Sequence, residues 1–124
     1  MAVTARLPDL HPHNVVIDCA DHAVVVPFWE AALGWTSRPI NEQFVMLRPP
    51  EGSGVSFSIL FQQVPEPKVV KNRAHIDFDA GDMAAEVDRL IELGGSVVAE
   101  HRLGDFRWTI VADPEGNEFC VTIR

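Results

Sequence analysis

The chain repeats itself at a spacing of 61 residues. A shift of 61 places residues 14–21 on residues 75–82, and five identities fall within residues 14–35. These identities are Asp18/Asp79, Asp21/Asp82, Ala23/Ala84, Val26/Val87 and Gly34/Gly95. The copies also end alike, because Pro-Glu-Gly stands at 50–52 and at 114–116, each before an apolar strand, with the offset grown to 64. Such self-similarity predicts two copies of one supersecondary unit.

The second copy indicates what each unit contains. From Arg73 to Asp82 apolar and polar side chains alternate, as in a strand with one buried face. The apolar positions are Ile76, Phe78 and Ala80, and the polar ones are His75, Asp77 and Asp79. Asp82 can cap a helix, because its carboxylate accepts from free backbone N–H groups, which is worth about 1 kcal/mol. The pattern therefore predicts a strand followed by a helical run over residues 83–95, stopped by Gly94-Gly95.

Each unit is predicted to consist of a strand, a helix and three further strands. The further strands are expected at 35–38, 44–48 and 55–62 in the first unit, and at 97–101, 107–112 and 118–123 in the second. The first helix is less regular, because an interior proline costs about 3 kcal/mol. Pro27 therefore predicts either a late start near Val26 or a kink. Residues 1–10 have no periodicity and are expected to form a loose arm.

Size and composition favour one domain over residues 1–124, with units at about 13–63 and 74–124. A net charge of −8 disfavours nucleic acid and anionic membrane as partners and is compatible with a cationic ligand. No apolar run is long enough to span a bilayer. Two cysteines without a secretory signal indicate the cytoplasm rather than a disulfide scaffold.

The alternation leaves one apolar face under a helix and one mixed face in each unit, as in an α+β protein whose curved sheets form a cup. On the mixed face, His75 and Asp77 are a candidate acid–base pair or a hydrogen-bonded pair without function. Cys120 is either a nucleophile or a small apolar filler. Trp108 is expected to line the cup and stack on a planar ligand. Arg73, with two nearby lysines, is a candidate anion contact at the rim.

Three motifs resemble the vicinal oxygen chelate superfamily, which includes glyoxalase, bleomycin-resistance protein and extradiol dioxygenase. They are Asp21 with Phe28-Trp29 and Leu33-Gly34-Trp35, then His75-Ile-Asp-Phe78, then Asp113-Pro-Glu-Gly-Asn-Glu-Phe119. The segments Val64–Asp77 and Glu118–Val121 are similar, more narrowly, to glyoxalase-like domains of actinobacterial type. The resemblance covers residues 13–123 and implies two βαβββ repeats whose sheets form a cup, and a homodimer.

The resemblance also implies where a divalent metal would bind. Enzymes of this superfamily hold the ion on the first and last strand of each unit, and these positions fall on Asn14, Ser56, His75 and Cys120. Of these, His75 has a usual ligand identity, and Cys120 could bind a soft metal as thiolate. We therefore expect no metal centre of the usual kind, and if a metal is bound, His75 and Cys120 as its ligands.

The leading expectation is a glyoxalase-like protein that holds a small organic molecule in the cup, with unassigned activity and no cofactor. One alternative is a metal-dependent lyase, isomerase or dioxygenase. Another is a protein-interaction module, which a cup filled by its own side chains would favour. The expected ligand contacts are Asn14, Ser56, His75, Cys120, Trp108 and Arg73, with His75 and Asp77 as the catalytic candidates.

Overall fold

The computed structural model describes residues 8–124. Two units of the same order follow one another along the chain, each consisting of a strand, a helix and three strands. The first comprises β1 (Asn14–Cys19), α1 (His22–Leu33), β2 (Thr36–Pro39), β3 (Phe44–Arg48) and β4 (Ser58–Gln63). The second comprises β5 (Asp77–Ala80), α2 (Met83–Glu92), β6 (Ser96–Leu103), β7 (Phe106–Ala112) and β8 (Glu118–Ile123). The arm expected over residues 1–10 lies for the most part in residues 1–7, outside the described range.

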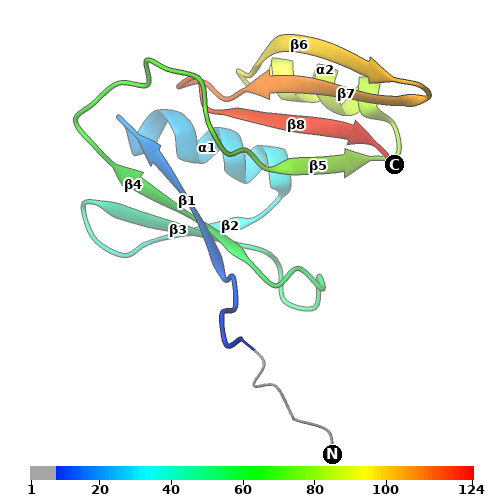
Figure 1. Cartoon of the computed structure of the whole chain (residues 1–124). Coiled ribbons are helices and arrows are strands. Elements are labelled where there is room, and N and C mark those ends of the chain that lie inside the picture. The colour runs from blue at the N-terminus through cyan, green and yellow to red at the C-terminus, as the bar shows by residue number, and fades with distance from the viewer. Residues whose placement is uncertain (1–7) are drawn as a thin grey trace, which may run out of the picture.

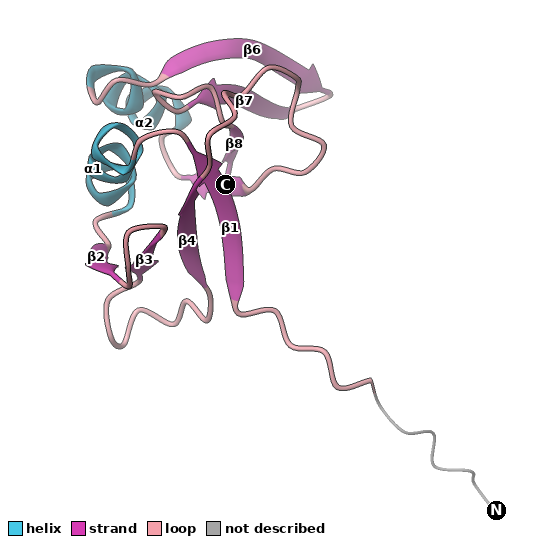
Figure 2. Cartoon of the chain, turned by 90° about the vertical axis from the view of Figure 1, so that its left-hand side faces the viewer, coloured by secondary structure: helices cyan, strands magenta, loops and turns pink. Residues whose placement is uncertain are grey.

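Each unit contributes its own four-stranded sheet, with the orders β1-β4-β3-β2 and β5-β8-β7-β6. In both sheets the first strand runs parallel to the last, and the other pairings are antiparallel. Strands β1 and β5 are therefore edge strands, and the two sheets are not joined. Both helices lie on one side of the sheets (Figure 2). The linker between the units arches from the end of β4 to the start of β5 (Figure 1). The expected α+β architecture of two βαβββ units is confirmed.

The helices begin where the sequence predicts. The Asp21 carboxylate accepts from the Ala23 N–H at 2.9 Å, and the Asp82 carboxylate accepts from the Ala85 N–H at 3.0 Å. Because Asp21 starts α1 at His22, the late start near Val26 does not occur, and the exposed Pro27 lies inside the helix. The glycines expected as helix stops also fit, with φ of 68° at Gly34 after α1.

Two strands begin later than expected. Strand β4 starts at Ser58 rather than at Val55, because residues 54–57, after the turn at 51–53, form no regular structure. Strand β5 starts at Asp77, so that His75 stands in the extended segment just before it. The Cys120 N–H donates to the Ile76 carbonyl at 2.9 Å, so the backbone at this point is still held against β8.

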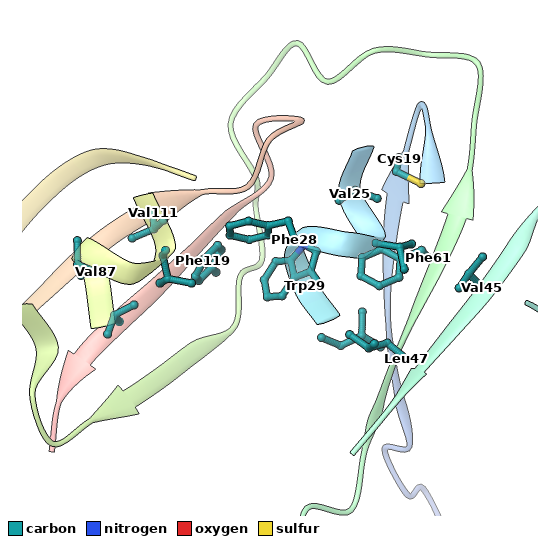
Figure 3. Close-up of a cluster of buried hydrophobic side chains, with 14 of the residues drawn as sticks. Cys19, Val25, Phe28, Trp29, Val45, Leu47, Phe61, Val87, Val111 and Phe119 are labelled. Carbon is teal, nitrogen blue, oxygen red and sulfur yellow. The ribbon is translucent and has the colours of Figure 1, made fainter. Parts of the chain in front are cut away.

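One continuous core is shared by the two sheets. Phe28 and Trp29 of α1 lie between Phe119 of the second unit and Phe61 of the first (Figure 3). The ring of Trp29 has its centroid 4.7 Å from that of Phe119 and 6.5 Å from that of Phe61. Across the helix pair, the Arg89 guanidinium donates to the Ala31 and Ala32 carbonyls. The first helix therefore packs against strands of both units.

Candidate functional site

Strand β1 and the segment that leads into β5 border a cavity of about 440 Å³, here called the β1–β5 cavity. Its wall is formed by β1, the end of the linker up to Ile76, and the start of β8 with the residue before it. The lining residues are Val15, Val16, Ile17, Asp18, Trp29, Asn72, Ala74, His75, Ile76, Asn117, Glu118 and Phe119. The lining is mostly apolar with several polar groups, which is the usual composition of a small-molecule site.

His75 and Asp77 form the pair that their alternation predicts. The His75 Nε2 atom lies 3.3 Å from Asp77 Oδ1, and both side chains are partly exposed, at 47% and 62%. Strand pairing places Asp77 opposite Cys120. As a result, ligand atoms of His75, Asp77 and Cys120 all lie within 4.8 Å of one another. This grouping is the chemically most varied cluster in residues 8–124.

The Cys120 thiol is buried, with 4% of the residue exposed. Burial raises the pKa of this thiol, and the Asp77 carboxylate raises it further by its charge and its hydrogen bond. A reactive cysteine needs the opposite environment, in which neighbouring positive charge stabilises the thiolate. The surroundings of Cys120 therefore disfavour the nucleophile interpretation and favour a protonated thiol.

Sequence reasoning did not include Glu118 among the site residues, although it expected this residue on the mixed face of the last strand. The Glu118 side chain is only 14% exposed, and the Lys71 ammonium lies 3.7 Å from its Oε1 atom. The Asn72 amide donates to the Glu118 backbone carbonyl at 3.3 Å, which attaches the linker to the start of β8. The signal available in the sequence was a glutamate at the start of the last strand, two residues before Cys120 and so on the same face.

The first unit presents different residues from those expected. Ser56 is exposed and precedes β4. Strand pairing matches Val16 with Leu60, and it matches Asp77, the repeat equivalent of Val16, with Cys120. The structural counterpart of Cys120 is therefore Leu60, not Ser56. Asn14 is half-buried at the start of β1 and pairs with Ser58.

Trp108 and Arg73 do not line the β1–β5 cavity. Strand pairing places Trp108 opposite Thr122, on the same face of the sheet as Cys120. Its ring stacks on that of His101, with centroids 5.2 Å apart and planes 24° apart, and it also borders a smaller cavity beside α2. Arg73 is exposed in the linker.

The turn at residues 113–117 has a structural role that the sequence did not reveal. The buried Asp113 carboxylate accepts from the Trp29 indole N–H, the Asn117 amide, and the backbone N–H groups of Glu115 and Asn117, each at 2.9 Å. The Glu115 carboxylate accepts from the backbone N–H groups of Ala20 and Asp21, at 2.6 and 2.9 Å. This turn of the second unit is thus hydrogen-bonded to the first unit at Trp29 and at the entry to α1.

The metal positions implied by the superfamily resemblance do not form a complete ligand set. In the first unit, Asn14 offers only a neutral amide, the register counterpart of Cys120 is a leucine, and Ser56 lies outside the strand. The second unit supplies imidazole, carboxylate and thiol within 4.8 Å. Three donors of these types suit a soft divalent ion such as Zn²⁺, provided that the thiol loses its proton.

Neither helix in residues 8–124 is long and apolar enough to cross a membrane. Among curated proteins no sequence matches this chain.

Solved structures share the fold. A glyoxalase/bleomycin resistance protein/dioxygenase superfamily member from Sphaerobacter thermophilus DSM 20745 has a TM-score of 0.71 at 19% identity, covering 94% of this chain and 98% of its own. The lactoylglutathione lyase from Agrobacterium tumefaciens has a TM-score of 0.68 at 16% identity, with 94% and 96% covered. TnmS3, an antibiotic binding protein from Streptomyces sp. CB03234, has a TM-score of 0.70 at 17% identity, with 95% and 98% covered. At such identities the likeness shows the fold alone.

The sequence itself carries the family assignment. The glyoxalase-like domain family matches residues 14–122, from the first residue of β1 nearly to the end of β8. The match contains both repeat units and the motifs at 28–35, 75–78 and 113–119. This chain therefore belongs to the glyoxalase-like domain family.

Proposed function

We propose that this protein binds a small organic molecule in the β1–β5 cavity, without the four-residue metal centre of its enzymatic relatives. The observation that carries the proposal is a cavity of about 440 Å³ whose lining is mostly apolar and includes several polar groups. The open cavity also argues against a protein-interaction module, which would need a cup filled by its own side chains. An antibiotic-binding neighbour of the same fold supports the binding role by analogy.

A substitution that fills the cavity tests this function. Val16 lines the cavity and is 50% exposed, so a Trp at this position occupies ligand space without disturbing the core. Val24 on α1 is similarly exposed, at 45%, and lies outside the cavity. We expect a chemically diverse compound library to contain ligands that raise the melting temperature of the wild type and of Val24→Trp, because a ligand of the folded state stabilises it.

Val16→Trp should lose those shifts while keeping its own melting temperature within a few degrees. Nuclear magnetic resonance mapping of the hits should report perturbed signals around Ile17, His75 and Asn117. Ligands that bind Val16→Trp as well as the wild type would contradict the proposed site, and a library without any hit would contradict the function.

A second candidate is metal-dependent chemistry, favoured by the cluster of His75, Asp77 and Cys120. These three side chains would hold the ion, which when bound supplies Lewis-acid polarisation of a ligand oxygen. Titration with Co²⁺ distinguishes the candidates, because a Cys120 thiolate bound to Co²⁺ gives a charge-transfer absorption. The absorption should vanish in Cys120→Ser and His75→Ala and persist in Cys19→Ala. Stoichiometric metal in the purified protein would favour this candidate over the first.

We infer three further properties. Both cysteines are unpaired and buried, which fits a reducing compartment and hence a cytoplasmic location. The unpaired edges of β1 and β5 and the superfamily resemblance support a homodimer. Sedimentation analysis across protein concentrations tests the dimer. The net charge of −8 supports the expectation that nucleic acid is not a partner.

A further inference from the structure

One carboxylate oxygen in the β1–β5 cavity lacks a hydrogen-bond donor. Glu118 is the first residue of β8, and its Oε1 atom is buried without a hydrogen-bond partner among residues 8–124. Buried polar atoms in folded proteins nearly always have a partner, and a carboxylate oxygen can accept from more than one donor. Because Glu118 is a lining residue of the cavity, a shift of its side chain would offer this oxygen to a ligand N–H group.

The nearest cation does not satisfy this oxygen. The Lys71 ammonium is 3.7 Å from Glu118 Oε1, which is within ion-pair range but beyond a hydrogen bond. The Lys71 side chain is 75% exposed and lies in the linker, outside the cavity lining. Because the ammonium end of this pair is largely in solvent, the interaction contributes little binding energy. Lys71 can therefore move into solvent at low cost when another cation approaches the same oxygen.

The other lining residues favour a ligand that has an apolar body and one positive charge. Two carboxylates, Glu118 and Asp18, line it, and no Lys or Arg is among the lining residues that the structure describes. The histidine in the lining, His75, is already paired with Asp77 at 3.3 Å. Beside these groups, the partly exposed side chains of Val16, Ile17 and Ile76 offer apolar surface. A ligand with an apolar body and one ammonium group matches both parts.

We propose that Glu118 is the specificity residue of the cavity and that the ligand class is a protonated apolar amine. The inference rests on the proposed function, because it names the chemistry of the molecule held there. The ligand ammonium donates to Glu118 Oε1 and takes the place of Lys71, while its apolar part lies against Val16, Ile17 and Ile76. Carboxylate ligands are excluded, because their charge would face both Glu118 and Asp18.

Three probes with a similar apolar body and different end groups separate the contribution of charge to binding from that of apolar contact. We choose 4-phenylbutylamine, 4-phenylbutanol and 4-phenylbutyrate, and measure their dissociation constants for the full-length protein by ligand-observed nuclear magnetic resonance. The amine should bind about 10-fold more tightly than the alcohol, because a charge-assisted hydrogen bond is roughly twice as strong as a neutral one. The carboxylate should bind more weakly than the alcohol.

Variants test whether Glu118 causes the preference for the amine over the alcohol. Glu118→Gln keeps the shape and removes the charge, so it should abolish the preference for the amine over the alcohol. Glu42→Gln makes the same change at an exposed position in the turn between β2 and β3, and should keep the preference. Lys71→Met removes the competing cation and should tighten amine binding several-fold without affecting the alcohol.

The possible failures are distinct. Equal binding of amine and alcohol, or a preference that survives in Glu118→Gln, overturns the inference and leaves the proposed function intact. Saturable binding of the alcohol or the carboxylate, without binding of the amine, also overturns the inference and leaves the proposed function intact. Absence of amine binding at millimolar concentration also overturns the inference, whereas the library screen decides the proposed function independently, because it includes neutral and anionic compounds.

Discussion

The two cysteines occupy different positions, yet each is held as a neutral thiol. Cys19 ends β1, with 2% of the residue exposed, and burial together with nearby Glu115 and Asp113 raises the pKa of its thiol to about 12. Cys120 faces Asp77, and its pKa is also raised. Neither thiol is therefore activated, which is consistent with a binding site rather than with cysteine nucleophile chemistry.

Cys19 should make the protein less stable in alkali. Below pH 9 both folded and unfolded chains hold the thiol proton, and between pH 9 and about 12 only the folded chain does. The folded state then binds more protons, so the free energy of unfolding falls as pH rises, by about 1.4 kcal/mol per pH unit for one such group. Urea unfolding between pH 8 and 11 should show this slope.

Cys19→Ala is the control for that slope. It removes the titrating group and keeps every other ionisable group of the chain. Its free energy of unfolding should depend less steeply on pH than that of the wild type. Equal slopes in the two proteins would contradict the assignment to Cys19.

At the residue scale, the sequence predicted part of the candidate site. The spacing of His75 and Asp77 placed them together on one face, because side chains two apart along extended chain share a face. Ser56 was wrongly matched with Cys120 because the two Pro-Glu-Gly motifs are 64 residues apart. The strands that follow these motifs are equivalent at an offset of 60, so that Leu60 is the counterpart of Cys120. Glu118 was missed because its importance depends on the missing donor at Oε1, which only three-dimensional contacts reveal.

At the element scale, the turn at residues 113–117 connects the two units. Its hydrogen bonds are directed at Trp29 and at the backbone leading into α1. The sequence identified this stretch as a turn, and Gly116 indeed has a φ of 89°. The partner of the turn could not be predicted, because Trp29 and Asp113 are 84 residues apart and local patterns carry no information about such contacts.

Removal of the Asp113 carboxylate should destabilise the protein strongly. Asp113 is 3% exposed and accepts four hydrogen bonds, and Asp113→Ala leaves the buried Trp29 indole N–H without a partner. Each unsatisfied buried group costs about 1–3 kcal/mol, so we expect a loss of roughly 2–4 kcal/mol in the free energy of unfolding. Urea unfolding measures it, with Asp105→Ala in the exposed turn between β6 and β7 as the control.

A double-mutant cycle with Trp29→Phe isolates the contact between the units. If the indole–carboxylate hydrogen bond carries part of the loss, the two substitutions will be less than additive, because each removes the same bond. Additive losses would show that Asp113 acts only within its own turn.

The helices show how local signals and distant contacts combine. Asp21 and Asp82 were recognisable as caps from sequence alone, because a cap depends on neighbours within one turn. Proline inside α1 gave a misleading signal, since propensity opposed a helix that tertiary packing maintains. Val25, Val26, Phe28 and Trp29 are all buried, on both sides of Pro27 in the chain. Burial of these side chains outweighs the intrinsic cost of the proline.

At the scale of the whole molecule, the repeat determined the architecture before any individual element was assigned. The equivalence of the units survives in the structure, where Cys19 and Ala80 accept from Val64 and Arg124 at matching places. The sequence could not show that the sheets stay separate, with β1 and the segment before β5 bordering a cavity. That arrangement depends on the Trp29 ring. Its centroid lies 4.7 Å from the ring centroid of Phe119 and 6.1 Å from that of Phe78.

The shared core predicts that neither unit folds alone. Phe78 and Phe119 of the second unit pack on Trp29 of the first, and a unit of this size buries too little apolar surface to offset its chain entropy. A peptide of residues 74–124 should therefore lack a cooperative thermal transition by circular dichroism. Mixing it with residues 1–73 should restore the transition, and Trp29→Ala in the first fragment should prevent the restoration. A cooperative transition in the isolated peptide would instead mean that the repeat units are independent domains, and the β1–β5 cavity would then lie at a domain interface.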